Sequence, residues 1–180
     1  MKIIKKYLSN KELEPIHQLL GEHVYMVYSE RFRVNINLNL FESSCFSLSS
    51  KKGFFNFQTS WIDFDDYEYY QLHIEQTDNP KGIKKSEGGF MLPFSTINIT
   101  PSSAIVKVEL FEDKDEEEWN SEGRELITVK YDSSLLFTQQ DEKQFLVGVS
   151  ETIADLTLFI RDRQSIVEHL EPMKKRLEWK

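Results

Sequence analysis

The sequence has little of what several protein classes require. Cys45 is the one cysteine among 180 residues, so no disulfide can form within the chain and a reducing compartment fits best. Seven glycines and five prolines are too few for collagen-like, linker-like or proline-rich segments. In contrast, 39% of the residues are hydrophobic and 13% are aromatic, which is enough for a core. The length favours a single domain spanning residues 1–180.

Long apolar runs and clusters of positive charge are missing as well. No stretch approaches the roughly 18 uninterrupted apolar residues of a membrane-spanning helix, and the first residues, MKIIKKYLSN, lack an apolar region of secretory length. We therefore expect a cytoplasmic protein without a membrane partner. The formal net charge is −8 and no basic stripe is visible. We expect no nucleic acid partner, because binding a phosphate backbone requires clustered Lys and Arg.

An alternation of apolar and polar residues with period two indicates several half-exposed β-strands. The clearest run covers residues 31–41, where apolar side chains alternate with Arg and Asn. It predicts one long strand, and similar runs lie at residues 70–75, 106–110 and 127–132. Short connections between further candidates favour antiparallel neighbours. The predicted fold is mainly β (α+β): an antiparallel sandwich or partly closed barrel of about 8–11 strands, over about residues 23–160.

Amphipathic helices are predicted at both ends of this β core. An apolar stripe at helical spacing, with Ser9 and Glu12 as a capping box, predicts a helix over about residues 10–20. A second stripe predicts a helix over about residues 163–178, which Pro172 should kink or divide. Each stripe is expected to pack against the sheet.

The negative charge is concentrated in one segment. Residues 109–125 contain nine acidic residues against Lys114 and Arg124, and we predict a long exposed loop at residues 112–125, which includes Trp119. One interpretation is a solvated connection that keeps a β protein soluble. The other is a contact surface for a basic protein partner, in which carboxylates speed the encounter and the tryptophan supplies a buried anchor.

A second acidic and aromatic cluster lies at residues 63–70, where an Asx-rich turn is the simpler interpretation. The cluster is also a candidate for the same recognition surface. The leading hypothesis is a cytoplasmic, non-enzymatic protein-binding module, and its concrete form is an inhibitor or immunity-type antagonist that masks a basic cleft. The candidate partner-binding residues are Glu116, Glu117, Glu118, Trp119, Asp65, Asp66 and Tyr67.

The polar side of residues 31–41 supports an alternative function. Arg31, Arg33 and Asn35 would line a polar cavity if the sheet closed or were covered. His73 lies on the polar side of another predicted strand and could face the same cavity. These four residues are the candidate ligand-binding residues of a small-molecule carrier or sensor.

Motifs for catalysis and metal binding are missing from the sequence. The four histidines lack the spacing of zinc ligands, and Cys45 has no companion cysteine. The Lys- and Gly-containing residues 79–89 do not match a phosphate-binding loop, and no nucleophile motif is found. We therefore predict no metal, no cofactor and no catalytic residue. Enzyme activity stays open, because residues far apart in a sequence can still assemble an active site.

Overall fold

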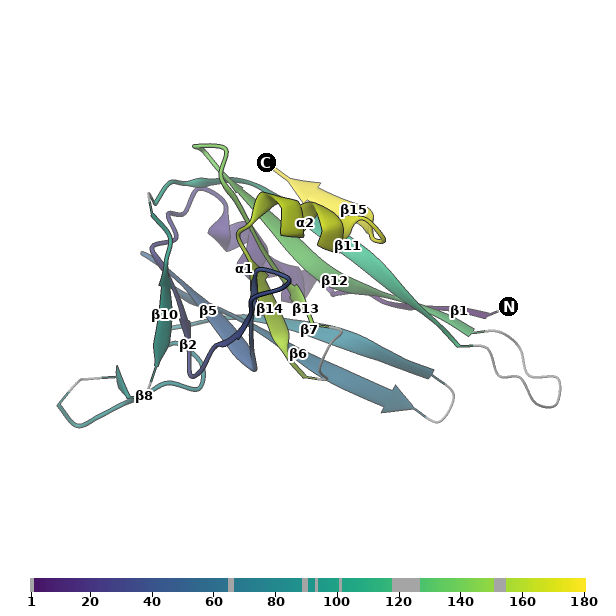
Figure 1. Ribbon diagram of the computed structural model, residues 1–180, viewed down its shortest axis with the longest axis horizontal. Helices are drawn as coiled ribbons and strands as arrows, with labels where there is room; N and C mark the ends of the chain where they lie inside the picture. The colour runs from purple at the N-terminus through teal and green to yellow at the C-terminus, as the bar shows by residue number, and fades with distance from the viewer. Residues whose placement is uncertain are drawn as a thin grey trace.

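The computed structural model describes residues 2–64, 67–88, 91–92, 94–100, 102–117, 127–150 and 155–180. Fifteen strands and two helices lie in these residues, of which 59% are in strands and 12% are helical. The two main sheets pack face to face, and neither is closed (Figure 1). The predicted mainly β (α+β) sandwich is confirmed. The strands outnumber the expected 8–11 because several of them have only two to four residues.

The larger sheet contains eight strands. They are β1 (Lys2–Lys6), β3 (Arg33–Asn35), β4 (Leu40–Ser43), β11 (Ile105–Glu117), β12 (Ile127–Gln139), β13 (Gln144–Val149), β14 (Thr157–Ile160) and β15 (Lys174–Trp179). Their order is β15-β11-β12-β13-β14-β4-β3, and β1 lies parallel to the first half of β12. The other pairs in this sheet are antiparallel.

The smaller sheet contains five antiparallel strands in the order β10-β2-β5-β6-β7. They are β2 (Met26–Ser29), β5 (Cys45–Ser50), β6 (Gly53–Phe64), β7 (Tyr67–Thr77) and β10 (Ser95–Asn98). A short separate ribbon pairs β8 (Lys84–Lys85) with β9 (Met91–Leu92). The predicted strands at residues 70–75, 106–110 and 127–132 are thus confirmed in β7, β11 and β12.

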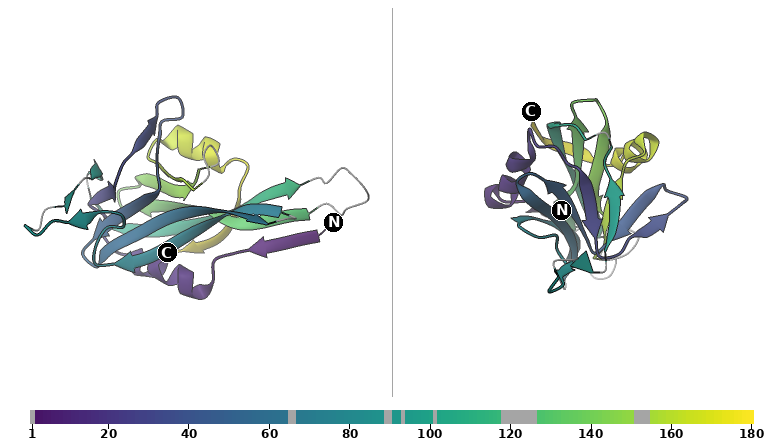
Figure 2. Two further views of the ribbon diagram at one scale, coloured as in Figure 1. Left: turned by 90° about the horizontal axis from the view of Figure 1, so that it is seen from below. Right: turned by 90° about the vertical axis from the view of Figure 1, so that its left-hand side faces the viewer.

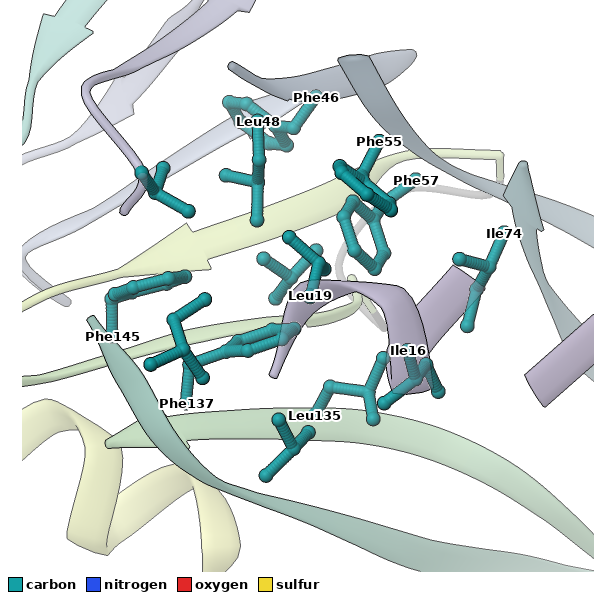
Figure 3. Close-up of a cluster of buried hydrophobic side chains, with 14 of the residues drawn as sticks. Ile16, Leu19, Phe46, Leu48, Phe55, Phe57, Ile74, Leu135, Phe137 and Phe145 are labelled. Carbon is teal, nitrogen blue, oxygen red and sulfur yellow. The ribbon is translucent and has the colours of Figure 1, made fainter. Parts of the chain in front are cut away.

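The core lies between the two sheets and is rich in phenylalanine. Phe46, Leu48, Phe55 and Phe57 from the smaller sheet meet side chains of β12, β13 and β14 (Figure 3). The rings of Phe137 and Phe145 stack with centroids 4.9 Å apart. Aromatic side chains of this size bury about 150–250 Å² each, so the cluster supplies much of the apolar burial that stabilises the sandwich.

Helix α1 (Asn10–Leu19) adds its apolar side to this core. Its buried residues are Leu13, Ile16 and Leu19, and Figure 3 shows Ile16 and Leu19 among the core side chains of the sheets. The capping box predicted for Ser9 and Glu12 is present in both directions. The N-terminal helix prediction is confirmed because its capping and its apolar stripe are local properties.

The predicted long strand at residues 31–41 is wrong. Strands β3 and β4 pair as a short hairpin with a turn at residues 36–39, which projects from the body of the molecule (Figure 2). Asn35 Oδ1 accepts a hydrogen bond from the Leu38 backbone N–H at 3.2 Å, and Asn39 has a positive φ of 49°. Asparagine favours such turns, because its side chain mimics a backbone acceptor and tolerates the left-handed region.

The predicted C-terminal helix over residues 163–178 is too long. Helix α2 (Arg163–Leu170) ends before Pro172, and the next residues form β15 along the edge of β11. Pairing with the edge of β11 satisfies the backbone N–H and C=O groups of these residues. The local sequence pattern could not predict this pairing. The predicted loop at residues 112–125 also begins too early, because β11 continues to Glu117. No helix among the described residues has the length and apolar character needed to cross a membrane.

Candidate protein-binding surface

The structure brings two acidic and aromatic segments to one end of the molecule. Strand β7 packs there against the first half of β12 (Figures 1 and 2). Tyr69 from β7 is buried with Val129 and Tyr131 from β12, and four isoleucine and tyrosine residues complete this second cluster together with Tyr67. Segments about 60 residues apart in the sequence therefore meet through their apolar sides.

Two carboxylates lie opposite each other on the end of the β6–β7 hairpin. Asp63 is paired with Glu68 across the two strands, and Trp61 is paired with Tyr70, so all four side chains project from the same face of the ribbon. The Trp61 Nε1–H donates a hydrogen bond to Glu68 Oε2 at 3.1 Å. The Trp61 backbone N–H donates to Asp155 Oδ1 at 2.6 Å. We call Trp61, Asp63, Glu68 and Asp155 the Trp61 patch.

The Trp61 patch combines exposed aromatic surface with negative charge. Trp61 is 40% exposed. Neither Asp63 nor Glu68 makes an ion pair with any residue that the structure describes. Like charges directly opposite each other in a sheet repel, and a cation placed between them would relieve this repulsion. The face of an adjacent indole also attracts cations.

The opposite face of the same hairpin end already holds a cation. Lys6 of β1 lies over three aromatic rings, with its Nζ 5.5 Å from the centroid of Phe64, 5.6 Å from that of Tyr67 and 5.3 Å from that of Tyr69. These distances are within the range of cation–π attraction. Phe64 is 47% exposed, so this aromatic face also reaches solvent.

Four of the seven residues predicted to bind a partner lie outside the described residues: Asp65, Asp66, Glu118 and Trp119. Tyr67 begins β7, is half-buried and lies 5.1 Å from Phe64 between ring centroids. Glu116 and Glu117 end β11, where their backbones pair with the start of β12. Glu116 and Glu117 therefore lie in a strand and not in the predicted loop.

Trp61 and Asp155 were not among the predicted site residues. Period-two spacing from Asp63 could have placed Trp61 on the face of the acid pair. No local pattern could have found Asp155, which lies 94 residues further along the chain from Trp61. The tertiary structure alone brings that carboxylate to the β6 edge.

The four residues predicted to bind a small molecule do not line one cavity. Arg33 and Asn35 line a cleft of about 360 Å³ on the β3–β4 hairpin, and Arg31 is exposed just before β3. His73 lines a different cleft, of about 340 Å³, on the outer side of β6 and β7. The two groups belong to different sheets, and the carrier hypothesis loses the shared cavity on which it depended.

A buried serine–histidine pair lies on the larger sheet. Ser134 Oγ and His169 Nε2 are 3.0 Å apart, and burial lowers the pKa of His169. Ser134 is fully buried, so its hydroxyl is inaccessible to a substrate. The hydrogen bond anchors α2 to β12, and we assign it a structural role.

The described residues contain no group of three or more His, Cys, Asp or Glu side chains arranged to hold a metal ion. Cys45 is buried, and burial raises the pKa of its thiol to about 11, which is unlike the lowered pKa of reactive cysteines. No protein-family model matches the chain, and no curated protein or solved structure matches it.

Proposed function

We propose that this protein is a non-enzymatic protein-binding module whose Trp61 patch takes up a basic side chain of its partner. The observation that carries the proposal is that Asp63 and Glu68 lie opposite each other beside the exposed ring of Trp61 and make no ion pair with a described residue. A tryptophan next to charged side chains that can lose their hydration water has the composition of a binding hot spot.

The chemistry of the patch favours arginine over lysine. A guanidinium has a planar set of donors that bridges carboxylates and stacks on an aromatic face. Asp63 and Glu68 would accept its N–H groups, and Trp61 would supply the stacking surface. Because Asp155 binds the Trp61 backbone, it holds this part of β6 in place and adds a third negative charge.

The partner is expected to present a basic surface, and an antagonist that masks a basic cleft is the concrete form of this function. The net charge of −8 adds a long-range attraction that increases the association rate. Such attraction is screened by salt, since the Debye length falls to roughly 3 Å at 1 M ionic strength.

The test is affinity capture from a lysate of the protein's own cells, at low and then at high salt. The wild-type protein should retain a basic protein that high salt releases. The double variant Asp63→Lys/Glu68→Lys should bind this protein at least tenfold more weakly. Charge reversal at a hot spot should reduce the binding free energy by about 1.4 kcal/mol or more.

The matched control is Glu168→Lys/Glu171→Lys, which makes the same change in net charge on exposed residues of α2 and its C-cap. This control should retain most of the binding. Equal losses in both variants would mean that only net charge matters, and the proposal would be wrong. It would also be wrong if the wild-type protein captured nothing at either salt concentration.

A further inference from the structure

A cleft of about 500 Å³ lies between the β12–β13 turn and the start of α2 (Figure 1). Its lining residues come from the end of β12, the turn, the start of β13, the end of β14 and the first half of α2. None of them belongs to the Trp61 patch. A volume of this size is typical of a site for a small molecule.

The cleft collects positive charge in an acidic protein. Lys143 lies between β12 and β13, Arg161 follows β14 and Arg163 begins α2, and all three line the cleft. Glu142 is the one carboxylate among the described residues of the lining. Three cations and one carboxylate give the lining a formal charge of +2, whereas the whole chain carries −8. Because like charges repel, a bound anion would stabilise this arrangement.

Two further acidic residues of these segments already have hydrogen-bond donors. Asp141 Oδ1 accepts from Ser103 Oγ at 2.9 Å, and Asp141 Oδ2 lies 3.1 Å from Lys143 Nζ. Asp162 caps α2 by accepting from the Ser165 backbone N–H at 2.9 Å. Neither carboxylate lines the cleft, so neither occupies the place of a bound anion.

Several donors of the cleft are held in position and still have free N–H groups. Arg161 Nη1 donates to the Asn98 carbonyl oxygen at 2.8 Å, which leaves the other N–H groups of its guanidinium for a ligand. The buried Gln139 donates through Nε2 to the Ser103 carbonyl oxygen at 3.1 Å. Arg163 makes no ion pair with any residue that the structure describes. The cleft therefore offers guanidinium, ammonium and amide donors together.

We propose that this cleft binds a small phosphorylated molecule, with its phosphate held by Arg161, Arg163 and Lys143. The planar N–H groups of arginine match phosphate oxygens in pairs, and lysine adds a point charge. A phosphate group carries about two negative charges at neutral pH, which balances the charge of the lining. This ligand is separate from the basic partner of the Trp61 patch, and its binding does not depend on that partner.

The first experiment is calorimetric titration with pyrophosphate at constant ionic strength, with citrate as the carboxylate comparison. Pyrophosphate should bind with a dissociation constant on the order of 100 μM. Citrate should bind at least about tenfold more weakly, because its carboxylates do not have the tetrahedral oxygens of a phosphate. No binding of pyrophosphate up to about 10 mM, or equal binding of both anions, would overturn the proposal.

Variants of Arg163 test the site itself. Arg163→Gln should weaken pyrophosphate binding about tenfold or more, and Arg163→Lys about threefold to tenfold, because lysine keeps the charge without the planar donors. Arg31→Gln is the matched control, since Arg31 is exposed outside the cleft, and it should bind as the wild type does. Unchanged binding by Arg163→Gln, or equal weakening by Arg31→Gln, would refute this site.

Removing the acidic residue of the lining should have the opposite effect. Glu142→Gln eliminates a negative charge that repels the anion, so pyrophosphate should bind about threefold to tenfold more tightly. Glu171→Gln makes the same change in net charge at the exposed C-cap of α2, outside the cleft, and should leave the affinity unchanged. Equal gains in both variants would show that net charge alone controls binding, and the cleft would not be the site.

Discussion

Arg176 donates two hydrogen bonds to Asp132, from Nε to Oδ1 and from Nη2 to Oδ2, each 2.6 Å long. The Asp132 side chain is 0% exposed. The Leu8 backbone N–H also donates to Asp132 Oδ2 at 2.7 Å, and the Arg176 guanidinium lies 4.5 Å from the ring centroid of Tyr7. One buried ion pair therefore joins the segment after β1 to β12 and β15.

Removing one partner of this ion pair should strongly destabilise the protein. Asp132→Asn leaves the Arg176 charge without its carboxylate, and we expect a loss of about 3 kcal/mol in the free energy of unfolding. Replacing both residues with apolar residues should cost less, because no unpaired charge is left. Urea unfolding of both variants measures this difference. An unchanged midpoint for Asp132→Asn would refute the role given to the pair.

Stability should fall at alkaline pH as Tyr7 ionises. Burial, together with its 2.6 Å hydrogen bond to Glu112, raises the pKa of Tyr7 from 10.0 to about 12. A raised pKa means that folding favours the protonated phenol. This contribution is complete below about pH 10 and is lost as the pH rises to about 12.

The Tyr7→Phe variant checks this pH dependence. It lacks the ionisable hydroxyl, so the difference in stability between wild type and variant should shrink between pH 10 and pH 12. Unfolding in urea at several pH values gives this difference. A difference that stays constant over the range would show that Tyr7 does not titrate in this way.

Gly148 should not tolerate a side chain. A Cβ atom at this position would overlap Ser134 Oγ and lie 3.1 Å from the Ser133 carbonyl oxygen. We expect Gly148→Ala to lower the free energy of unfolding by about 1–3 kcal/mol. The cost should be smaller in a Ser134→Gly background, where the overlapping side chain is gone. Equal costs in both backgrounds would place the strain elsewhere.

Cys45 should react slowly with thiol reagents in the folded protein. It is 7% exposed, and burial raises the pKa of its thiol to about 11, so little of the reactive thiolate is present at pH 8. We expect labelling by an aromatic disulfide to be at least about 100-fold slower in the native state than in denaturant. Rapid native labelling would mean that the start of β5 opens readily.

Local patterns predicted the parts of the fold that local interactions decide. The Ser9–Glu12 capping box is a local contact. Apolar and polar residues alternate along parts of β7, β11 and β12, so short-range spacing was enough to predict these strands. Residues 31–41 show the same periodicity, but asparagine side chains turn the chain there. The apolar stripe after Pro172 is compatible with a helix, but these residues pair with the edge of β11 as a strand.

The sequence by itself determined the fold class, the start of α1 and the uneven distribution of charge, since these depend on residue type and short-range spacing. The tertiary structure decided where the acidic segments meet, how β15 pairs and which carboxylate reaches Trp61. These relationships join residues up to 94 positions apart. They depend on strand order and sheet packing, which arise from the whole core and from no local pattern.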